Sequence, residues 1–137
     1  MQTKLRPYLN FKENTREVME FYKSIFGGKL QINTFKELHA SKDPSEDDLV
    51  MHSVLESDDI EFMASDTPRR MDHKPISGFS LSLIGDNETE LRGYFEKLSS
   101  EGSITMPLQK AIWGDTFGMC IDKFGVSWLV NISPAPK

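Results

Sequence analysis

Hydrophobic and polar residues alternate over two short stretches that lie far apart in the chain. In Tyr8-Leu9-Asn10-Phe11 and in Phe79-Ser80-Leu81-Ser82-Leu83 an apolar residue recurs at every second position, which is the period of a strand with one buried face. Each stretch precedes a polar turn and then apolar residues at helical spacing, which predicts helices over about residues 15–26 and 87–99. Three further extended runs follow each helix, at about 29–36, 49–56 and 60–65 and at about 103–108, 113–121 and 127–132.

The two halves of the chain therefore repeat one order of elements, a strand, a helix and three strands. A shift of 72 positions also places apolar residues of the first half on apolar residues of the second, among them Leu9 on Leu81 and Tyr22 on Tyr94. Repetition of this kind indicates a duplicated module. The sequence predicts a single domain over residues 1–137, composed of module one at about 5–65, a linker at 66–77 and module two at about 78–133.

The predicted fold class is α+β, with two βαβββ modules that form a curved mixed sheet. Each module bends its short sheet, its helix covers the convex side, and the paired modules leave a cup-shaped cavity lined by strands. Concave, partly apolar cavities are the usual place for a small ligand. The pattern predicts the place of a ligand without naming the ligand.

Short motifs along nearly the whole chain, from about residue 5 to 133, resemble one protein family. They are Pro7-Tyr8-Leu9-x-Phe11, Glu20-Phe21-Tyr22, Ile25-Phe26-Gly27-Gly28, Met51-His52-Ser53-x-Leu55, Ser65-Asp66, Trp113-Gly114-Asp115-x-Phe117-Gly118 and Asp122-x-Phe124-Gly125-Val126-x-Trp128. The sequence is similar to PhnB-like proteins of the vicinal oxygen chelate superfamily, which includes glyoxalase I, bleomycin-resistance proteins and extradiol dioxygenases. This resemblance implies the glyoxalase/bleomycin resistance/dihydroxybiphenyl dioxygenase-like fold and a homodimer.

The superfamily that the sequence resembles also includes enzymes that place a divalent metal in the cup, on His, Glu or Gln side chains of the first and last strands. If Leu9 faces its helix, strand alternation turns Tyr8 and Asn10 toward the cup. The same alternation leaves Glu61 as the one carboxylate on the last strands, without a histidine. Three or four converging donors are needed to hold such an ion, so the sequence predicts no catalytic metal and no cofactor.

Three further side chains are candidates for a binding site, each with a structural alternative. His52 lies between apolar neighbours of a predicted strand, where an imidazole acts as an acid, a base or a ligand, or only makes a half-buried contact. Trp113 and Asp115 alternate with Phe117 along the penultimate predicted strand, at about 113–121. Their shared face either lines the cup, as an aromatic wall beside a carboxylate, or packs in the core while Asp115 caps a turn.

Other polar clusters have structural interpretations. Asp122-Lys123-Phe124-Gly125 is typical of a hairpin turn. Cys120 lies between apolar residues, where a buried thiol has a raised pKa and is unreactive. The basic residues of the predicted linker are either solvated or a clamp for an anion; they are Arg69, Arg70, His73 and Lys74.

Charge and composition narrow the function classes further. The 137 residues carry a net charge of -5, which disfavours a general nucleic-acid surface. No apolar run approaches the roughly 20 residues of a membrane span, and neither the single cysteine nor the polar N-terminus indicates export, so a cytoplasmic location is predicted. The pair Gly27-Gly28 follows a predicted helix instead of opening one, so a doubly wound methyltransferase is not predicted.

The leading hypothesis is a metal-free, homodimeric small-molecule-binding protein, in which Trp113 stacks on the ligand while His52, Asp115 and Glu61 orient its polar groups. The residues predicted to line the pocket are Tyr8, Asn10, His52, Glu61, Trp113 and Asp115. No catalytic residue is assigned. One alternative is a metal-dependent glyoxalase-like lyase or isomerase, or a resistance-type thiol transferase, that uses Glu61 and His52. Another is a dimerisation or regulatory module whose own side chains fill the cup.

Overall fold

The computed structural model of the chain describes residues 3–58, 60–69 and 71–134. The chain divides into two compact units, Met1–Ile76 and Ser77–Lys137. Each described unit repeats the order β, α, β, β, β, which confirms the predicted α+β fold of two βαβββ modules. The elements are β1 Tyr8–Phe11, α1 Thr15–Phe26, β2 Lys29–Thr34, the short 3-10 helix η1 Pro44–Glu46, β3 Val50–Ser57, β4 Ile60–Asp66, β5 Leu81–Gly85, α2 Glu88–Ser99, β6 Ser103–Lys110, β7 Thr116–Ile121 and β8 Ser127–Ile132.

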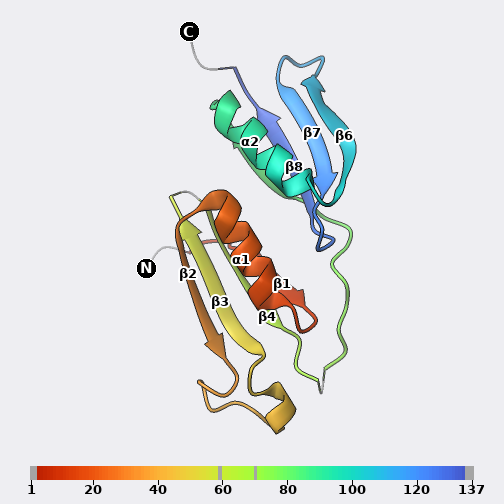
Figure 1. The fold of residues 1–137 in the computed structure, drawn as a ribbon. Helices are drawn as coiled ribbons and strands as arrows, with labels where there is room; N and C mark the ends of the chain where they lie inside the picture. Colours follow the sequence, from red (N-terminus) through yellow and green to blue (C-terminus); the bar gives the residue numbers. More distant parts are fainter. Residues whose placement is uncertain (1–2, 59, 70, 135–137) are drawn as a thin grey trace. The chain divides into compact units, whose positions relative to one another are not determined.

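The first unit is a four-stranded mixed sheet covered on one face by a helix. Its strands lie in the order β1-β4-β3-β2, with β1 parallel to β4 and the other neighbours antiparallel. Helix α1 lies across this sheet and packs on β2, β3 and β4 (Figure 1). The strand residues that face α1, among them Leu9, Phe11, Leu55 and Phe62, are buried. Burial of these side chains is the main source of the unit's stability.

The second unit repeats this topology with its own core. Its strands lie in the order β5-β8-β7-β6, with β5 parallel to β8, and α2 packs on the sheet. Trp128, Val130 and Ile132 of β8 are buried, while Leu129 and Asn131 lie on the opposite side of the strand. The alternation predicted for the last strand is therefore confirmed.

Both helices begin where the sequence pattern indicates. Helix α1 spans the predicted residues, and the backbone N–H of its first residue, Thr15, is bound by the Asp66 carboxylate at 3.0 Å. Helix α2 begins one residue after the prediction because Asn87 is its N-cap, with the side chain accepting a hydrogen bond from the Glu90 N–H at 3.1 Å. In each case an oxygen acceptor satisfies an N–H that has no partner within the helix.

The structure changes the predicted alignment of the two helices by one residue, while the predicted pairing of Leu9 with Leu81 in the first strands keeps both on the helix side of their sheets. The buried residues Val18 and Tyr22 of α1 correspond to Leu91 and Phe95 of α2, a shift of 73 and not 72 positions. Tyr94 is consequently only half-buried, and its hydroxyl donates to Glu90 at 2.8 Å. Two adjacent apolar residues on a helix allow either alignment, and only packing against the sheet distinguishes them.

The predicted strand starts are less accurate than the helices. Strand β5 begins at Leu81, the first residue that pairs with β8, and Phe79 lies before it with 51% of its surface exposed. Strand β7 begins at Thr116, three residues after the predicted start. Strand ends are set by pairing partners, which are distant in sequence.

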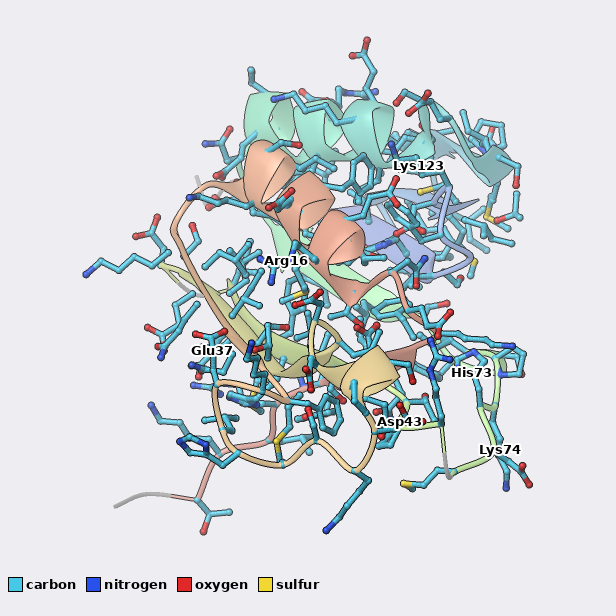
Figure 2. All side chains as sticks on the ribbon, turned by 60° about the horizontal axis from the view of Figure 1, so that its bottom comes forward. Arg16, Glu37, Asp43, His73, Lys74 and Lys123 are labelled. Atoms are coloured by element: carbon cyan, nitrogen blue, oxygen red, sulfur yellow. The ribbon has the colours of Figure 1, made fainter. Side chains whose placement is uncertain are left out.

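The loop between β2 and β3 is acidic and locally ordered (Figure 2). Glu37 accepts a hydrogen bond from the Thr34 N–H at 3.0 Å, and Asp43 opens η1 by accepting one from the Ser45 N–H at 2.9 Å. These backbone hydrogen bonds lower the pKa of both carboxyl groups. The loop therefore holds the carboxylates of Glu37 and Asp43 in place without burying them.

Neither of the described α-helices has the length and hydropathy that a membrane-spanning segment requires.

Candidate functional site

The face of the first sheet opposite α1, which we call the helix-free face of unit one, gathers polar and aromatic side chains. The register places Tyr8, Met63 and Val54 side by side across β1, β4 and β3. Directly paired strand residues share a face, and the buried Leu9 marks the opposite one. Tyr8 is 45% exposed, so the predicted alternation of β1 is confirmed. In the next row the Ser65 hydroxyl donates to Asn10 Oδ1 at 3.2 Å.

His52 also lies on the helix-free face of unit one. Its neighbour Ser53 is fully buried and donates to the Ala64 carbonyl at 2.7 Å, which turns the imidazole of His52 to the other side of β3. The His52 ring centroid lies 6.2 Å from that of Tyr8, with the two planes tilted by 32°. Within the described part of the chain no hydrogen bond engages the imidazole. Both ring nitrogens thus remain able to bind a ligand group.

Glu61, the second residue of β4, lies on the same face beside the residues that precede β1. Its Oε2 is 2.7 Å from Arg6 Nε, and both side chains are partly exposed. The ion pair cancels the one carboxylate that β4 presents on this face, because Asp66 of β4 is buried. The sequence pattern does not indicate this pairing, because it depends on the tertiary position of a residue before β1.

The donor set of unit one does not fit the divalent metal that the superfamily's enzymes hold. Among the described residues of the helix-free face the candidate ligands are His52, Glu56 and Glu61. Glu61 is engaged by Arg6, and Glu56 stands between Glu61 and Lys29 in the strand register. The other polar side chains there include the phenol of Tyr8 and the amide of Asn10. Over the described residues of both units, no three His, Cys, Asp or Glu side chains are placed to share a metal ion.

In unit two, Trp113 and Asp115 lie in a tight turn before β7 and not in the strand itself. The Ala111 N–H donates to the Asp115 carbonyl at 2.7 Å, and the Gly114 N–H donates to the Ala111 carbonyl at 3.0 Å. Gly114 has a φ of 99°, a conformation that L side chains rarely adopt. The predicted strand is interrupted here because the backbone closes this turn.

The turn joins its aromatic ring and its carboxylate to the helix-free face of unit two, the side of that sheet opposite α2. Asn131 Nδ2 donates to Asp115 Oδ2 at 2.9 Å. The Trp113 ring meets Phe117 edge-on, with centroids 5.8 Å apart, and Phe117 pairs with Asn131 across β7 and β8. Trp113 is 61% exposed, so the interpretation that it packs in the core is wrong. We call these four residues the aromatic–carboxylate cluster: Trp113, Asp115, Phe117 and Asn131.

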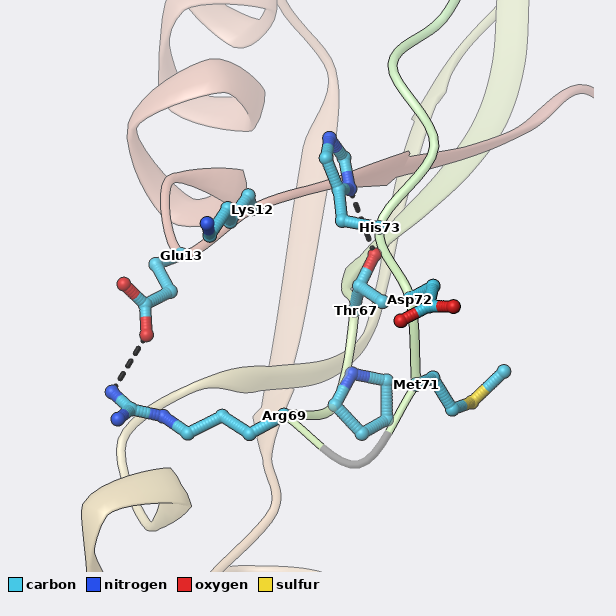
Figure 3. Close-up of a pocket in the computed structure, with 8 residues that line it drawn as sticks. Lys12, Glu13, Thr67, Arg69, Met71, Asp72 and His73 are labelled. Atoms are coloured by element: carbon cyan, nitrogen blue, oxygen red, sulfur yellow. Dashed lines mark hydrogen bonds and ion pairs between the residues drawn. The ribbon is translucent and has the colours of Figure 1, made fainter.

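The linker forms an open pocket of about 470 Å³ in unit one, drawn in Figure 3. Its most basic described side chain, Arg69, pairs with Glu13 at 2.6 Å, and Thr67 is hydrogen-bonded to His73 at 3.1 Å. The guanidinium is thus already neutralised, which disfavours an anion clamp. Arg70, the other arginine of the predicted cluster, lies outside the described residues.

Two buried carboxylates, Asp122 and Asp66, have structural roles. Asp122 Oδ1 accepts hydrogen bonds from the Phe124 and Val126 N–H groups at 2.9 and 3.1 Å, which confirms the predicted turn. Burial, with a smaller contribution from Asp122, raises the pKa of the Cys120 thiol to about 11, which agrees with the predicted buried thiol of raised pKa. Asp66, which belongs to one of the motifs of the family resemblance, accepts hydrogen bonds from the Thr15 and Val50 N–H groups.

Comparison with known proteins places this architecture in a family. The family described as 3-demethylubiquinone-9 3-methyltransferase matches residues 3–131. The chain belongs to this family. Protein PA1353 from Pseudomonas aeruginosa is 35% identical, with 97% of this chain and 99% of that one covered and a TM-score of 0.85. A PhnB protein from Bacillus cereus is 28% identical over 96% of this chain and all of its own, with a TM-score of 0.72.

More distant solved structures share the fold of this chain. A bleomycin-binding protein complexed with bleomycin covers 96% of this chain and 99% of its own at 17% identity and a TM-score of 0.58, which shows a shared fold. The resemblance to PhnB-like proteins of the glyoxalase/bleomycin resistance fold is thereby confirmed. In this PhnB-like chain the predicted site residues are divided between the units, with Tyr8, Asn10, His52 and Glu61 in the first and Trp113 and Asp115 in the second.

Proposed function

We propose that this PhnB-like chain is a small-molecule-binding protein whose helix-free sheet faces contact the ligand and whose binding requires no catalytic metal. The ligand contacts are made by the six predicted residues, four from unit one and two from unit two. A cytoplasmic location and assembly into a homodimer are further parts of this proposal, and they rest on the sequence and its family resemblance.

The observation that carries the proposal is the Tyr8–His52 pair on the helix-free face of unit one. A tilted aromatic pair with centroids 6.2 Å apart stands there beside the amide of Asn10. A sheet face that merely meets water is usually rich in charged side chains and threonine, which keep it soluble. The charged side chains of this face, Lys29, Glu56 and Glu61, stand in one row of the sheet. The neighbouring rows offer two rings, an amide and the thioether of Met63, a combination suited to a partly apolar ligand with a few polar groups.

The chemistry of this face supports recognition more directly than catalysis. The imidazole of His52 offers two ring nitrogens for hydrogen bonds, and Asn10 adds an amide that is oriented by Ser65. The one thiol, Cys120, is buried, and its pKa of about 11 leaves little thiolate at neutral pH. The described residues of this face therefore offer groups that orient a ligand, and no activated nucleophile is among them.

The methyltransferase named in the family description is not part of the proposal. A doubly wound methyltransferase binds its cofactor at a glycine-rich turn between a strand and a helix. In this chain the corresponding connections are Lys12-Glu13-Asn14 between β1 and α1 and Asp86-Asn87 between β5 and α2, and both lack glycine. The metal-dependent alternative gains no support either, because Arg6 already engages Glu61.

Native mass spectrometry of protein purified without nickel tests the assembly and the metal together. A dimer without divalent metal is the expected result, with or without a retained organic molecule. One divalent ion per subunit would overturn the metal-free proposal and restore the glyoxalase-like alternative.

Binding itself is tested by saturation-transfer NMR with a mixture of neutral, cationic and anionic aromatic fragments. The double variant His52→Ala/Trp113→Ala should lose the signals that the wild-type protein gives. His39→Asn is the matched control, because it removes an exposed imidazole from a loop of the same unit and asparagine tolerates its φ of 55°. Signals that survive in the double variant would sink the proposal.

A further inference from the structure

We propose that the aromatic–carboxylate cluster of unit two binds an organic cation, such as the quaternary ammonium or protonated amine of an aromatic ligand. This inference rests on the proposed function, because it names the ligand class for part of the same site. The cluster joins an exposed indole, Trp113, to a carboxylate, Asp115, that is fixed in place. Aromatic faces beside a carboxylate are the arrangement that recognises ammonium groups.

The carboxylate of Asp115 has no cationic partner in the described structure. None of the ion pairs among the described residues includes it, and its one hydrogen-bond donor from a side chain is the neutral amide of Asn131 at 2.9 Å. Asn131 binds only Oδ2, so Oδ1 is left for a ligand. The carboxylate is thus held in a fixed orientation by a neutral amide, without a compensating cation among the described residues.

The surrounding sheet does not compensate that charge. The four strands of unit two contain one charged residue, Lys110. Lys110 pairs with Thr116, which alternates with Phe117 and so belongs to the opposite side of β7. The helix-free face around Asp115 is built from apolar and amide side chains, including Met119, Leu129 and Asn131. A low-charge apolar surrounding strengthens the attraction between one carboxylate and one cation.

The indole supplies the second half of the recognition. Trp113 is 61% exposed even though its ring contacts Phe117 edge-on at 5.8 Å, so most of the indole surface is available to a ligand. The turn of Ala111 to Asp115, closed by hydrogen bonds of 2.7 and 3.0 Å, limits the movement of this side chain relative to the carboxylate. Pre-organisation of both groups lowers the entropy lost when a ligand binds.

The charge of the ligand follows from these groups. An anion would meet Asp115 and a chain of net charge -5, and it would find no basic side chain in the cluster. A neutral ring would gain only the contact with Trp113. A cation gains contacts with both the ring and the carboxylate, and each contact raises the affinity by a factor of a few to about thirty.

Indole N–H signals in two-dimensional ¹H–¹⁵N NMR spectra test the inference directly. The chain has two tryptophans, and Trp128 is 2% exposed with its Nε1–H bound to Asp122 at 2.9 Å, so it serves as an internal reference. The probes are benzyltrimethylammonium, benzyl alcohol and phenylacetate, which share a benzyl group and differ in charge. Benzyltrimethylammonium should move the Trp113 signal at about tenfold lower concentration than benzyl alcohol, and phenylacetate should be the weakest.

Two variants separate the carboxylate from the ring. Asp115→Asn keeps an oxygen for Asn131. It should weaken the binding of benzyltrimethylammonium about tenfold and leave the affinity for benzyl alcohol unchanged. The Trp128→Phe protein, which has one indole, identifies the Trp113 signal. Ile112→Ser is the matched control, since it removes the fully exposed apolar side chain next to Trp113 and should change neither affinity.

Several results would overturn the inference, and they are distinct from a failure of the proposed function. Equal affinity for the three probes, or no effect of Asp115→Asn on affinity, would refute the preference for a cation but leave a small-molecule site at Trp113. A Trp113 signal that responds to protein concentration and not to any probe means that a second copy of the chain covers the cluster. Signals from fragments that persist in His52→Ala/Trp113→Ala refute the broader proposal instead.

Discussion

Replacing Asp122 with asparagine should destabilise unit two although the side chain keeps its size and shape. Asp122 is 3% exposed in the turn between β7 and β8. Its Oδ1 accepts the Phe124 and Val126 N–H groups at 2.9 and 3.1 Å, and its Oδ2 accepts Trp128 Nε1–H at 2.9 Å. The two oxygens of this one carboxylate therefore accept all three hydrogen bonds.

The magnitude follows from what asparagine can still accept. Its single oxygen retains the two backbone hydrogen bonds, and its NH₂ group then faces the indole N–H of Trp128, so that two donors meet. Trp128 is 2% exposed, so water does not replace the carboxylate at its N–H. Loss of a buried hydrogen bond to a charged group lowers the free energy of unfolding by about 2–3 kcal/mol.

Urea unfolding followed by circular dichroism measures this loss, and a double-mutant cycle isolates its cause. Trp128→Phe removes the indole N–H, so Asp122→Asn in that background should cost less than about 1 kcal/mol. An equal loss in both backgrounds would refute the reasoning, because the cost would then lie in the backbone turn and not in the indole contact. A loss below about 0.5 kcal/mol in the wild-type background would refute it as well.

Three further outcomes follow from single positions. A Cβ at Gly102 would stand 2.0 Å from a backbone carbonyl oxygen, so Gly102→Ala should lower the free energy of unfolding in urea by about 1–3 kcal/mol. Gly93 lies in open space within α2, so Gly93→Ala should raise it by about 0.5–1 kcal/mol. Equal effects of the two substitutions would contradict this packing. Cys120, with its pKa raised to about 11 by burial, should resist a disulfide reagent at neutral pH until urea unfolds the chain, and prompt labelling of folded protein would show that the thiol is accessible. Backbone and side-chain hydrogen bonds of Thr34 lower the pKa of Glu37, so Thr34→Val should raise that pKa in an NMR titration, and an unchanged value would assign the shift to the backbone alone.

The elements that could be predicted are those whose signal is local. Helix α1 was predicted at its observed bounds because apolar residues recur at helical spacing and Gly27-Gly28 follows at its end. The faces of β1, β4 and β8 were predicted correctly because a half-buried strand alternates with a period of two. The positions of Tyr8 and Asn10 on the helix-free face followed from that alternation alone.

The features that could not be predicted depend on residues distant in sequence. Arg6 pairs with Glu61, and Asn131 holds Asp115, across gaps of many residues. The turn before β7 interrupts a pattern that looked like a continuous strand, because hydrogen bonds close around Gly114. Nothing in the period of the chain indicates such contacts, since each requires that separate strands first come together.

The sequence by itself determined the order of strands and helices, the buried face of each element and the family to which the chain belongs, because periodicity and short motifs are written in neighbouring residues. Only the tertiary structure decided which polar groups meet. It joined His52 to Tyr8 on one face, neutralised Glu61 with Arg6, and left the carboxylate of Asp115 beside an exposed indole. The physical reason is that charge and hydrogen bonding act over a few ångströms in space, whereas the residues concerned are separated by up to 55 positions in the chain.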